Sequence, residues 1–130
     1  MTLPEPGRIE QLWARQVGDD LFQVCCIPFF ARDLSLGDVV RTTAQGGRDF
    51  MVSEVVEPSG HWTFRVWLRD STEHSVSLEA GFMSSGALTE WSSEHLLALD
   101  VPDAPGAQRL ADELRAGEAA GRWIYEAGKP

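Results

Sequence analysis

The 130-residue chain has little lysine: ten of its eleven basic residues are arginine, and only Lys129 is a lysine. Such a preference for arginine is typical of GC-rich genomes and favours a bacterial source. The basic residues also form no block anywhere along the chain. Because proteins bind phosphate backbones through clustered Lys and Arg, which release counterions, we expect no nucleic-acid partner.

A long apolar run is also missing. None approaches the roughly eighteen residues that a membrane-spanning helix needs, and the first thirty residues lack the basic start and apolar core of a secretory signal. We therefore expect no membrane partner and a cytoplasmic location. With 43% hydrophobic residues, the chain can bury a core of its own without disulfides or metals.

Only two cysteines are present, the adjacent Cys25 and Cys26. Neighbouring side chains on a strand point to opposite faces, so a disulfide between them would be strained. No C-x-x-C motif accompanies them, and His61, His74 and His95 lack the spacing of a metal site. We expect no metal and no cofactor.

Acidic residues, in contrast, are abundant and unevenly distributed. The net charge of −9 divides into seven basic against nine acidic residues over 1–69, and four against eleven over 70–130. The acidic second half would attract a positively charged partner by electrostatic steering.

The second half of the chain has a clear order of expected elements. Alternation, helical spacing and turn signals predict strand, helix, strand, strand, helix, strand. The ranges are His61–Arg69, Asp70–Met83, Ala87–Ser92, Glu94–Val101, Gly106–Ala120 and Arg122–Glu126. This βαββαβ order is the split βαβ unit of the ferredoxin-like fold. Ser71–Met83 also alternates as a strand would, but the surrounding order needs a crossover and favours a helix.

The first half is predicted to contain four strands with short connections. They are Glu10–Val17, Leu21–Ile27, a strand following the Gly37-Asp38 turn, and Arg48–Glu57. In that turn we expect the aspartate to accept hydrogen bonds from nearby amides. Pro58–Gly60 is expected to make a hairpin turn into His61–Arg69, which would be shared between the halves.

The predicted fold is therefore α+β, with a small antiparallel β-barrel-like sheet fused to a ferredoxin-like βαββαβ unit. We expect residues 1–9 to be a flexible lead-in, 10–60 a β-rich N-terminal subdomain and 61–128 a ferredoxin-like C-terminal subdomain. The shared strand would join both subdomains into one compact unit.

The strand His61–Arg69 also provides a candidate binding surface. Its apolar face carries Trp62, Phe64, Val66 and Leu68, which we expect in the core. Its other face carries Arg65, Trp67 and Arg69, a combination suited to carboxylates or to an acidic and aromatic partner. The alternative is that Arg65 and Arg69 pair with acidic residues of neighbouring strands.

Other aromatic residues could extend this surface. Trp91 lies on the more polar face of its strand, so it could line a groove. Phe29 and Phe30 cannot both point inward in an extended segment, so one could line the same groove or form a dimer contact.

An enzymatic alternative depends on His61, Glu57 or a cysteine, Cys25 or Cys26, as the acid–base or nucleophilic group. Ser59 lies between Glu57 and His61, but no Gly-x-Ser-x-Gly elbow or phosphate-binding loop supports the cluster. The simpler interpretation of this segment is a turn between strands.

Several phrases in one order resemble a known family. They are Leu12-Trp13, Ile27-Pro28-Phe29-Phe30, Leu36-Gly37-Asp38-Val39-Val40, Val55-Val56-Glu57 with Ser59-Gly60-His61, and the run from Gly117 to Glu126. Together they resemble the bacterial domain of unknown function 4265, from about Glu10 to Gly128. The resemblance implies a small bacterial domain and no catalytic motif.

Our leading hypothesis is a non-enzymatic bacterial binding module that recognises a protein, peptide or small ligand through its sheet face. One specific form is an immunity or self-resistance factor whose acidic half neutralises a basic toxin. A small tailoring or modifying enzyme is the alternative, and a structural or assembly subunit, for example a homodimer, is the second.

Overall fold

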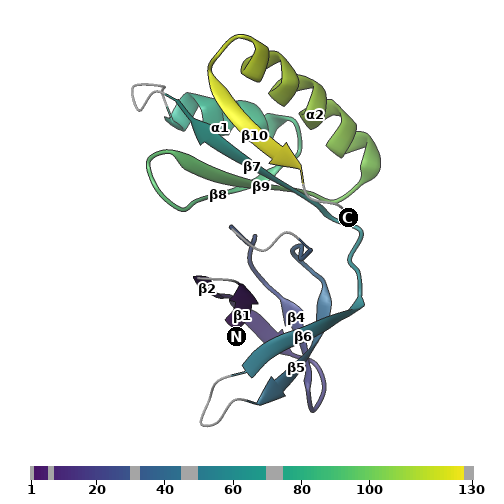
Figure 1. Cartoon of the computed structure of the whole chain (residues 1–130). Coiled ribbons are helices and arrows are strands. Elements are labelled where there is room, and N and C mark those ends of the chain that lie inside the picture. The colour runs from purple at the N-terminus through teal and green to yellow at the C-terminus, as the bar shows by residue number, and fades with distance from the viewer. Residues whose placement is uncertain (1, 6–7, 30–32, 45–49, 70–74, 128–130) are drawn as a thin grey trace.

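The computed structural model describes residues 2–5, 8–29, 33–44, 50–69 and 75–127, which form two β-sheets and two helices (Figure 1). The protein is thus a mixed α+β protein, as predicted. The first sheet has the strand order β2-β1-β6-β5-β4-β3, and the second has the order β10-β7-β9-β8.

The first sheet is built from the N-terminal part of the chain. Its strands are β1 (Thr2–Glu5), β2 (Arg8–Gln11), β3 (Ala14–Gln16), β4 (Leu21–Val24), β5 (Val39–Ala44) and β6 (Phe50–Glu57). Neighbours are antiparallel except β1 and β6, which pair in parallel. The strands β2 and β3 end the sheet, so the described strands do not close into a barrel.

Two features of this sheet differ from the sequence prediction. Strand β1 occupies Thr2–Glu5, where we expected an irregular lead-in. The single strand predicted over Glu10–Val17 is interrupted at Leu12 and Trp13, because β2 pairs with β1 whereas β3 pairs with β4. Leu12 turns into the core at this break, and Trp13 remains exposed.

The second sheet and both helices follow the predicted order. They comprise β7 (Trp62–Leu68), α1 (Ser75–Ser84), β8 (Leu88–Trp91), β9 (Leu96–Val101), α2 (Ala104–Ala119) and β10 (Trp123–Ala127). All neighbouring strands are antiparallel. The segment Ser71–Met83, for which a strand was the alternative, is therefore a helix where the structure describes it. The predicted start of this helix, residues 70–74, lies outside the described ranges.

Helix α2 illustrates how the sequence determines an element. Asp103 caps its start by accepting a hydrogen bond from the Gly106 amide at 2.7 Å. Ala107, Leu110 and Leu114, which recur at helical spacing, are all buried. Gly121 follows the helix with a φ of 79°, a conformation that favours glycine.

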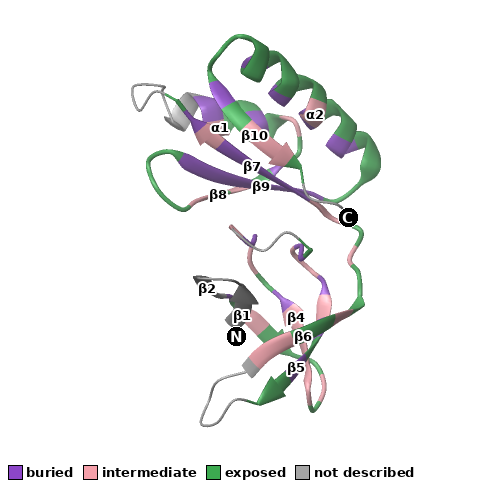
Figure 2. Cartoon of the chain, in the orientation of Figure 1, coloured by how far each residue is buried: buried purple, intermediate pink, exposed green. Residues whose placement is uncertain are grey.

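The larger core lies between the second sheet and its helices (Figure 2). Both helices cover the side of this sheet that is turned away from the first sheet (Figure 1). The predicted apolar face of β7 contributes Phe64, Val66 and Leu68 to this core. The first sheet has a smaller core made by Leu12, Val24, Leu34 and Val40.

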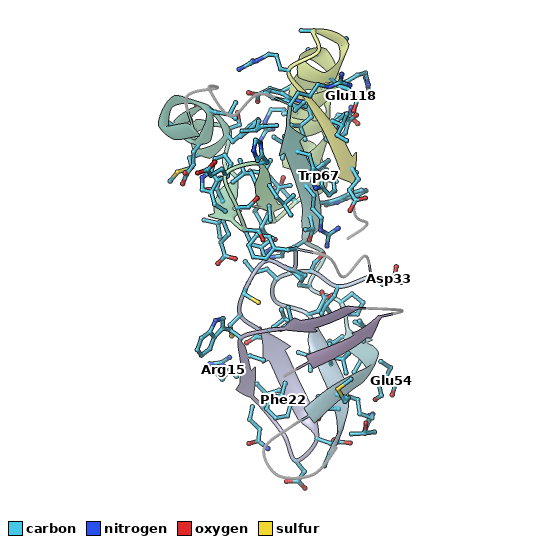
Figure 3. All side chains as sticks on the ribbon, turned by 60° about the vertical axis from the view of Figure 1, so that its left-hand side comes forward. Arg15, Phe22, Asp33, Glu54, Trp67 and Glu118 are labelled. Atoms are coloured by element: carbon cyan, nitrogen blue, oxygen red, sulfur yellow. The ribbon has the colours of Figure 1, made fainter. Side chains whose placement is uncertain are left out.

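The two halves lie end to end, with Trp67 and Glu118 in the helix-bearing half and Phe22 in the other (Figure 3). Strand β7 pairs only with β9 and β10, so it is not shared between the sheets. The hairpin predicted at Pro58–Gly60 is therefore wrong. This segment instead links the two separate sheets, with Gly60 at a φ of 84°.

Polar contacts hold the link in place. Asp38 accepts hydrogen bonds from the backbone amides of Ser35 at 2.9 Å and Ser59 at 2.8 Å. This is the role predicted for the aspartate of the Gly37-Asp38 turn, in which Gly37 has a positive φ of 89°. Ser35 also shares a hydrogen bond of 2.9 Å with Thr63 of β7.

Candidate functional site

A cavity of about 390 Å³ lies where residues of the first half meet strand β8 of the second sheet. Its lining is mostly apolar and aromatic. The lining residues are Leu12, Trp13, Cys26, Ile27, Phe29, Glu90 and Trp91. A volume above 300 Å³ and a largely apolar lining are usual for small-molecule sites.

Two segments of the first half form one wall. Leu12 and Trp13 lie at the break between β2 and β3, and Cys26, Ile27 and Phe29 follow β4. A hydrogen bond of 2.8 Å from the Cys25 amide to the Trp13 carbonyl joins the two segments. Leu12 and Ile27 are buried, whereas Trp13 is 81% exposed. The wall is thus anchored in the core and reaches solvent at Trp13.

Strand β8 forms the opposite wall, and the side chain of its aromatic residue, Trp91, is hydrogen-bonded to helix α1. The Trp91 indole donates a hydrogen bond of 2.7 Å to Glu79 of α1, and Thr89 donates one of 2.8 Å to the same carboxylate. These bonds, that of Trp91 above all, lower the pKa of Glu79. An ionised Glu79 therefore fixes the orientation of Trp91.

Glu90 brings a carboxylate to the cavity. It lies between Thr89 and Trp91 on β8, so its side chain points to the opposite face of the sheet, away from Glu79. Within the described ranges no ion pair or hydrogen bond engages the Glu90 carboxylate, and no basic residue is among the lining residues. Glu90 is exposed, so its charge is available to a ligand.

Arg65 holds the wall formed by the first half in position through hydrogen bonds. It is only 1% exposed, and its guanidinium donates hydrogen bonds to the Pro28 carbonyl at 3.1 Å and to Glu126 of β10 at 3.2 Å. The pairing with a neighbouring acidic residue is the alternative that the sequence left open. Pro28 lies between the lining residues Ile27 and Phe29, so its bond to Arg65 holds this part of the wall in position. Arg65 itself does not line the cavity.

A pair of a half-buried histidine and a buried carboxylate lies at the link between the sheets. The His61 Nδ1 is 2.9 Å and 3.0 Å from the two carboxylate oxygens of Asp100, which is 1% exposed. Burial raises the pKa of Asp100 above its ordinary value, an effect that His61 opposes and the charge of Asp38 reinforces.

This pair does not form the cluster that the sequence suggested. The Ser59 hydroxyl donates to the Leu36 carbonyl at 2.8 Å and accepts from the His61 backbone amide at 3.2 Å. The His61 ring contacts Asp100, and Glu57 is exposed at the end of β6. The described contacts thus give Ser59 a structural role in the turn.

The cavity brings together only part of the predicted binding surface. Phe29, Trp91 and Cys26 line it. Trp67 and Arg69 are not lining residues, and neither is the exposed Cys25. Phe30, which was predicted together with Phe29, lies outside the described residues.

Four lining residues were not singled out from the sequence: Leu12, Trp13, Ile27 and Glu90. Asp100, the partner of His61, was missed too. Trp13 carried a usable signal, because a tryptophan in a segment rich in polar residues is often a contact residue. Glu90 carried none, since an isolated glutamate on an alternating strand is normally a solvent-facing residue.

No group of three or more His, Cys, Asp and Glu side chains that could hold a metal ion occurs in the part of the chain that the structure describes. Neither of the helices there is long and apolar enough to cross a membrane.

Comparison with known proteins gives one family and one similar structure. The family model described as "Domain of unknown function (DUF4265)" matches residues 10–125. A crystal structure of a hypothetical protein from Neisseria gonorrhoeae has a TM-score of 0.82 and 21% sequence identity, covering 96% of this chain and 89% of its own. At this identity the likeness concerns the fold alone. None of the curated proteins matches the chain.

Proposed function

The chain belongs to the family of domain of unknown function 4265, whose description carries no activity, and we propose that it is a non-enzymatic binding module. Its binding site is the cavity between the two sheets, and its occupant is a small ligand. The observation that carries this proposal is the aromatic lining, contributed by Trp13, Phe29 and Trp91 from two sheets. A bacterial cytoplasm is the proposed place of action.

The way in which the walls are held supports this proposal. Glu79 orients Trp91, and Arg65 holds the Pro28 carbonyl behind Phe29. Binding sites whose side chains are fixed before the ligand arrives lose less conformational entropy on binding. Both supports come from residues that do not line the cavity.

The finer description of the fold is also a proposal. We propose that residues 62–127 form a ferredoxin-like unit, supported by the βαββαβ order and the strand order β10-β7-β9-β8. The first sheet is then an open accessory sheet on the side of this unit opposite the helices (Figure 1).

The remaining hypotheses have less support. The His61–Asp100 pair resembles the base and orienting carboxylate of many enzymes, but neither residue lines the cavity. An immunity factor or an assembly subunit would bind a protein through a wide surface, whereas the cavity has the size of a small-molecule site.

A thermal-shift screen of a metabolite library tests the proposed function. A ligand that binds only the folded protein raises its melting temperature by mass action. We expect at least one compound to stabilise the wild type and to lose this effect in Trp13→Ala, because Trp13 lines the cavity and is exposed. Val17→Ala, which removes another exposed apolar side chain nearby, is the matched control.

The proposed function is wrong if the compounds that stabilise the wild type stabilise Trp13→Ala equally. It is also wrong if no compound stabilises the wild type while a protein partner binds it with the same affinity in both variants.

A further inference from the structure

The geometry of the cavity points to the chemical class of its ligand: we propose that it binds a small organic cation, an ammonium or quaternary ammonium group on a compact apolar body. This inference rests on the proposed function, because it requires the cavity to be the binding site. Three features carry it: the aromatic lining, the charge of the lining and the size of the cavity.

Aromatic residues line the cavity from both halves of the protein. Trp13 and Phe29 come from one wall, and Trp91 comes from the other. The face of an aromatic ring is electrostatically negative, and tryptophan attracts cations most strongly. A ligand cation beside Trp13 and Phe29 is therefore attracted by their rings. Trp91 also lines the cavity, although its indole is bonded to Glu79 of α1. Neutral apolar ligands would gain the same buried area but not this attraction.

The charge of the lining selects the same class. Of the described residues that line the cavity, Glu90 is the one that carries a charge. A bound cation would compensate this carboxylate, whereas an anion would face it without a basic partner among the lining residues. The acidic second half of the chain, which contains Glu90, also favours the approach of a cation.

The size of the cavity limits the ligand. Its volume of about 390 Å³ lies at the lower end of the range for small-molecule sites. It suits a molecule with few heavy atoms. Because Trp13 and Glu90 are exposed, such a molecule can enter without unfolding the wall.

The test compares three probes of similar shape and different charge by isothermal titration calorimetry at low salt. The probes are choline as the cation, 3,3-dimethylbutan-1-ol as its neutral analogue and 3,3-dimethylbutanoate as the anion. We expect choline to bind about tenfold more tightly than the neutral analogue, a difference of about 1.4 kcal/mol, and the anion not to bind.

Glu90→Gln is the matched variant. It keeps the shape of the side chain and removes its charge, so choline should bind several-fold more weakly (roughly 1 kcal/mol), with only the attraction of the aromatic rings left to favour it over the neutral analogue. Glu94→Gln removes an exposed carboxylate that does not line the cavity, and it should bind choline as the wild type does. Circular dichroism of both variants checks that each is folded.

Each result decides a different proposal. Equal binding of choline and the neutral analogue, or unchanged binding in Glu90→Gln, overturns the selection of a cation and leaves the ligand cavity standing. No binding of choline up to about 10 mM, a range that covers weak affinities, also overturns it. The screen with Trp13→Ala decides the proposed function independently.

Discussion

The contact between Gly117 of α2 and Trp123 of β10 leads to a sharp prediction about stability. A methyl group added at Gly117 would overlap the Trp123 indole, with the ring atom Cη2 at 2.6 Å and two other ring atoms nearer still. Trp123 is fully buried, and its indole donates a hydrogen bond of 2.9 Å to the Leu114 carbonyl. It also packs against Phe82, with ring centroids 5.8 Å apart. The indole must therefore move if Gly117 becomes alanine.

The expected cost follows from these contacts. Forcing an extra methyl group into a packed core costs about 1–3 kcal/mol. Loss of the hydrogen bond of the displaced indole adds about 1 kcal/mol. Alanine is favoured over glycine inside a helix by about 1 kcal/mol, which offsets part of the cost. We expect Gly117→Ala to lower the free energy of unfolding by about 1–3 kcal/mol.

Gly81→Ala is the matched control, since Gly81 also lies within a helix. An added methyl group there would meet no described atom within 4 Å, so only the helix preference acts. It should raise the free energy of unfolding by about 0.5–1 kcal/mol. The two variants should thus change the free energy of unfolding in opposite directions and differ from each other by about 1.5–4 kcal/mol.

Urea denaturation followed by tryptophan fluorescence measures both variants, provided that the slopes of the transitions agree. Near-ultraviolet circular dichroism should also change in Gly117→Ala only, because Trp123 loses its fixed environment. A Gly117→Ala protein as stable as Gly81→Ala would refute the packing of α2 against β10.

Three further predictions concern charged side chains. Burial raises the pKa of Asp100 above its ordinary 3.8, so the contribution of Asp100 to stability should fall as the pH rises from 3.8 through the folded-state pKa. Urea denaturation across this range should show the wild type losing free energy of unfolding relative to Asp100→Asn. The pKa of Glu79 is lowered from 4.5, so its contribution to stability should instead be lost as the pH falls. Glu79→Gln should have a lower free energy of unfolding than the wild type at pH 7, and this difference should vanish as acid protonates Glu79 in the folded wild type. Arg65→Met should lower the free energy of unfolding by about 2–4 kcal/mol, because it removes a buried charge that bonds Glu126 and Pro28; a loss below about 0.5 kcal/mol in chemical denaturation would contradict this role.

The second half of the fold could be predicted well because its signals are local. Ala107, Leu110 and Leu114 recur at helical spacing, and each of them is buried. In His61–Arg69, alternation alone assigned Phe64 and Val66 to the core, which the structure confirms. These patterns depend on the period of an element and not on what packs against it.

The candidate site could be predicted only in part because it depends on contacts between distant segments. The break at Leu12 and Trp13 arises from a change of pairing partner, which no local pattern reports. The environment of Arg65 is set by Pro28 and Glu126, from the other sheet's loop and the last strand. The sequence identified Arg65 as a candidate binding residue. It could not decide whether the partner of its guanidinium is a ligand or a neighbouring acidic residue.

The contacts that hold the cavity wall also determine when the cavity can form during synthesis of the chain. The wall segment around Pro28 leaves the ribosome before β7, yet its support is Arg65, 37 residues later. The opposite wall, with Glu90 and Trp91, is translated later still. A nascent chain that ends before β8 therefore lacks one wall of the cavity and cannot capture a ligand there.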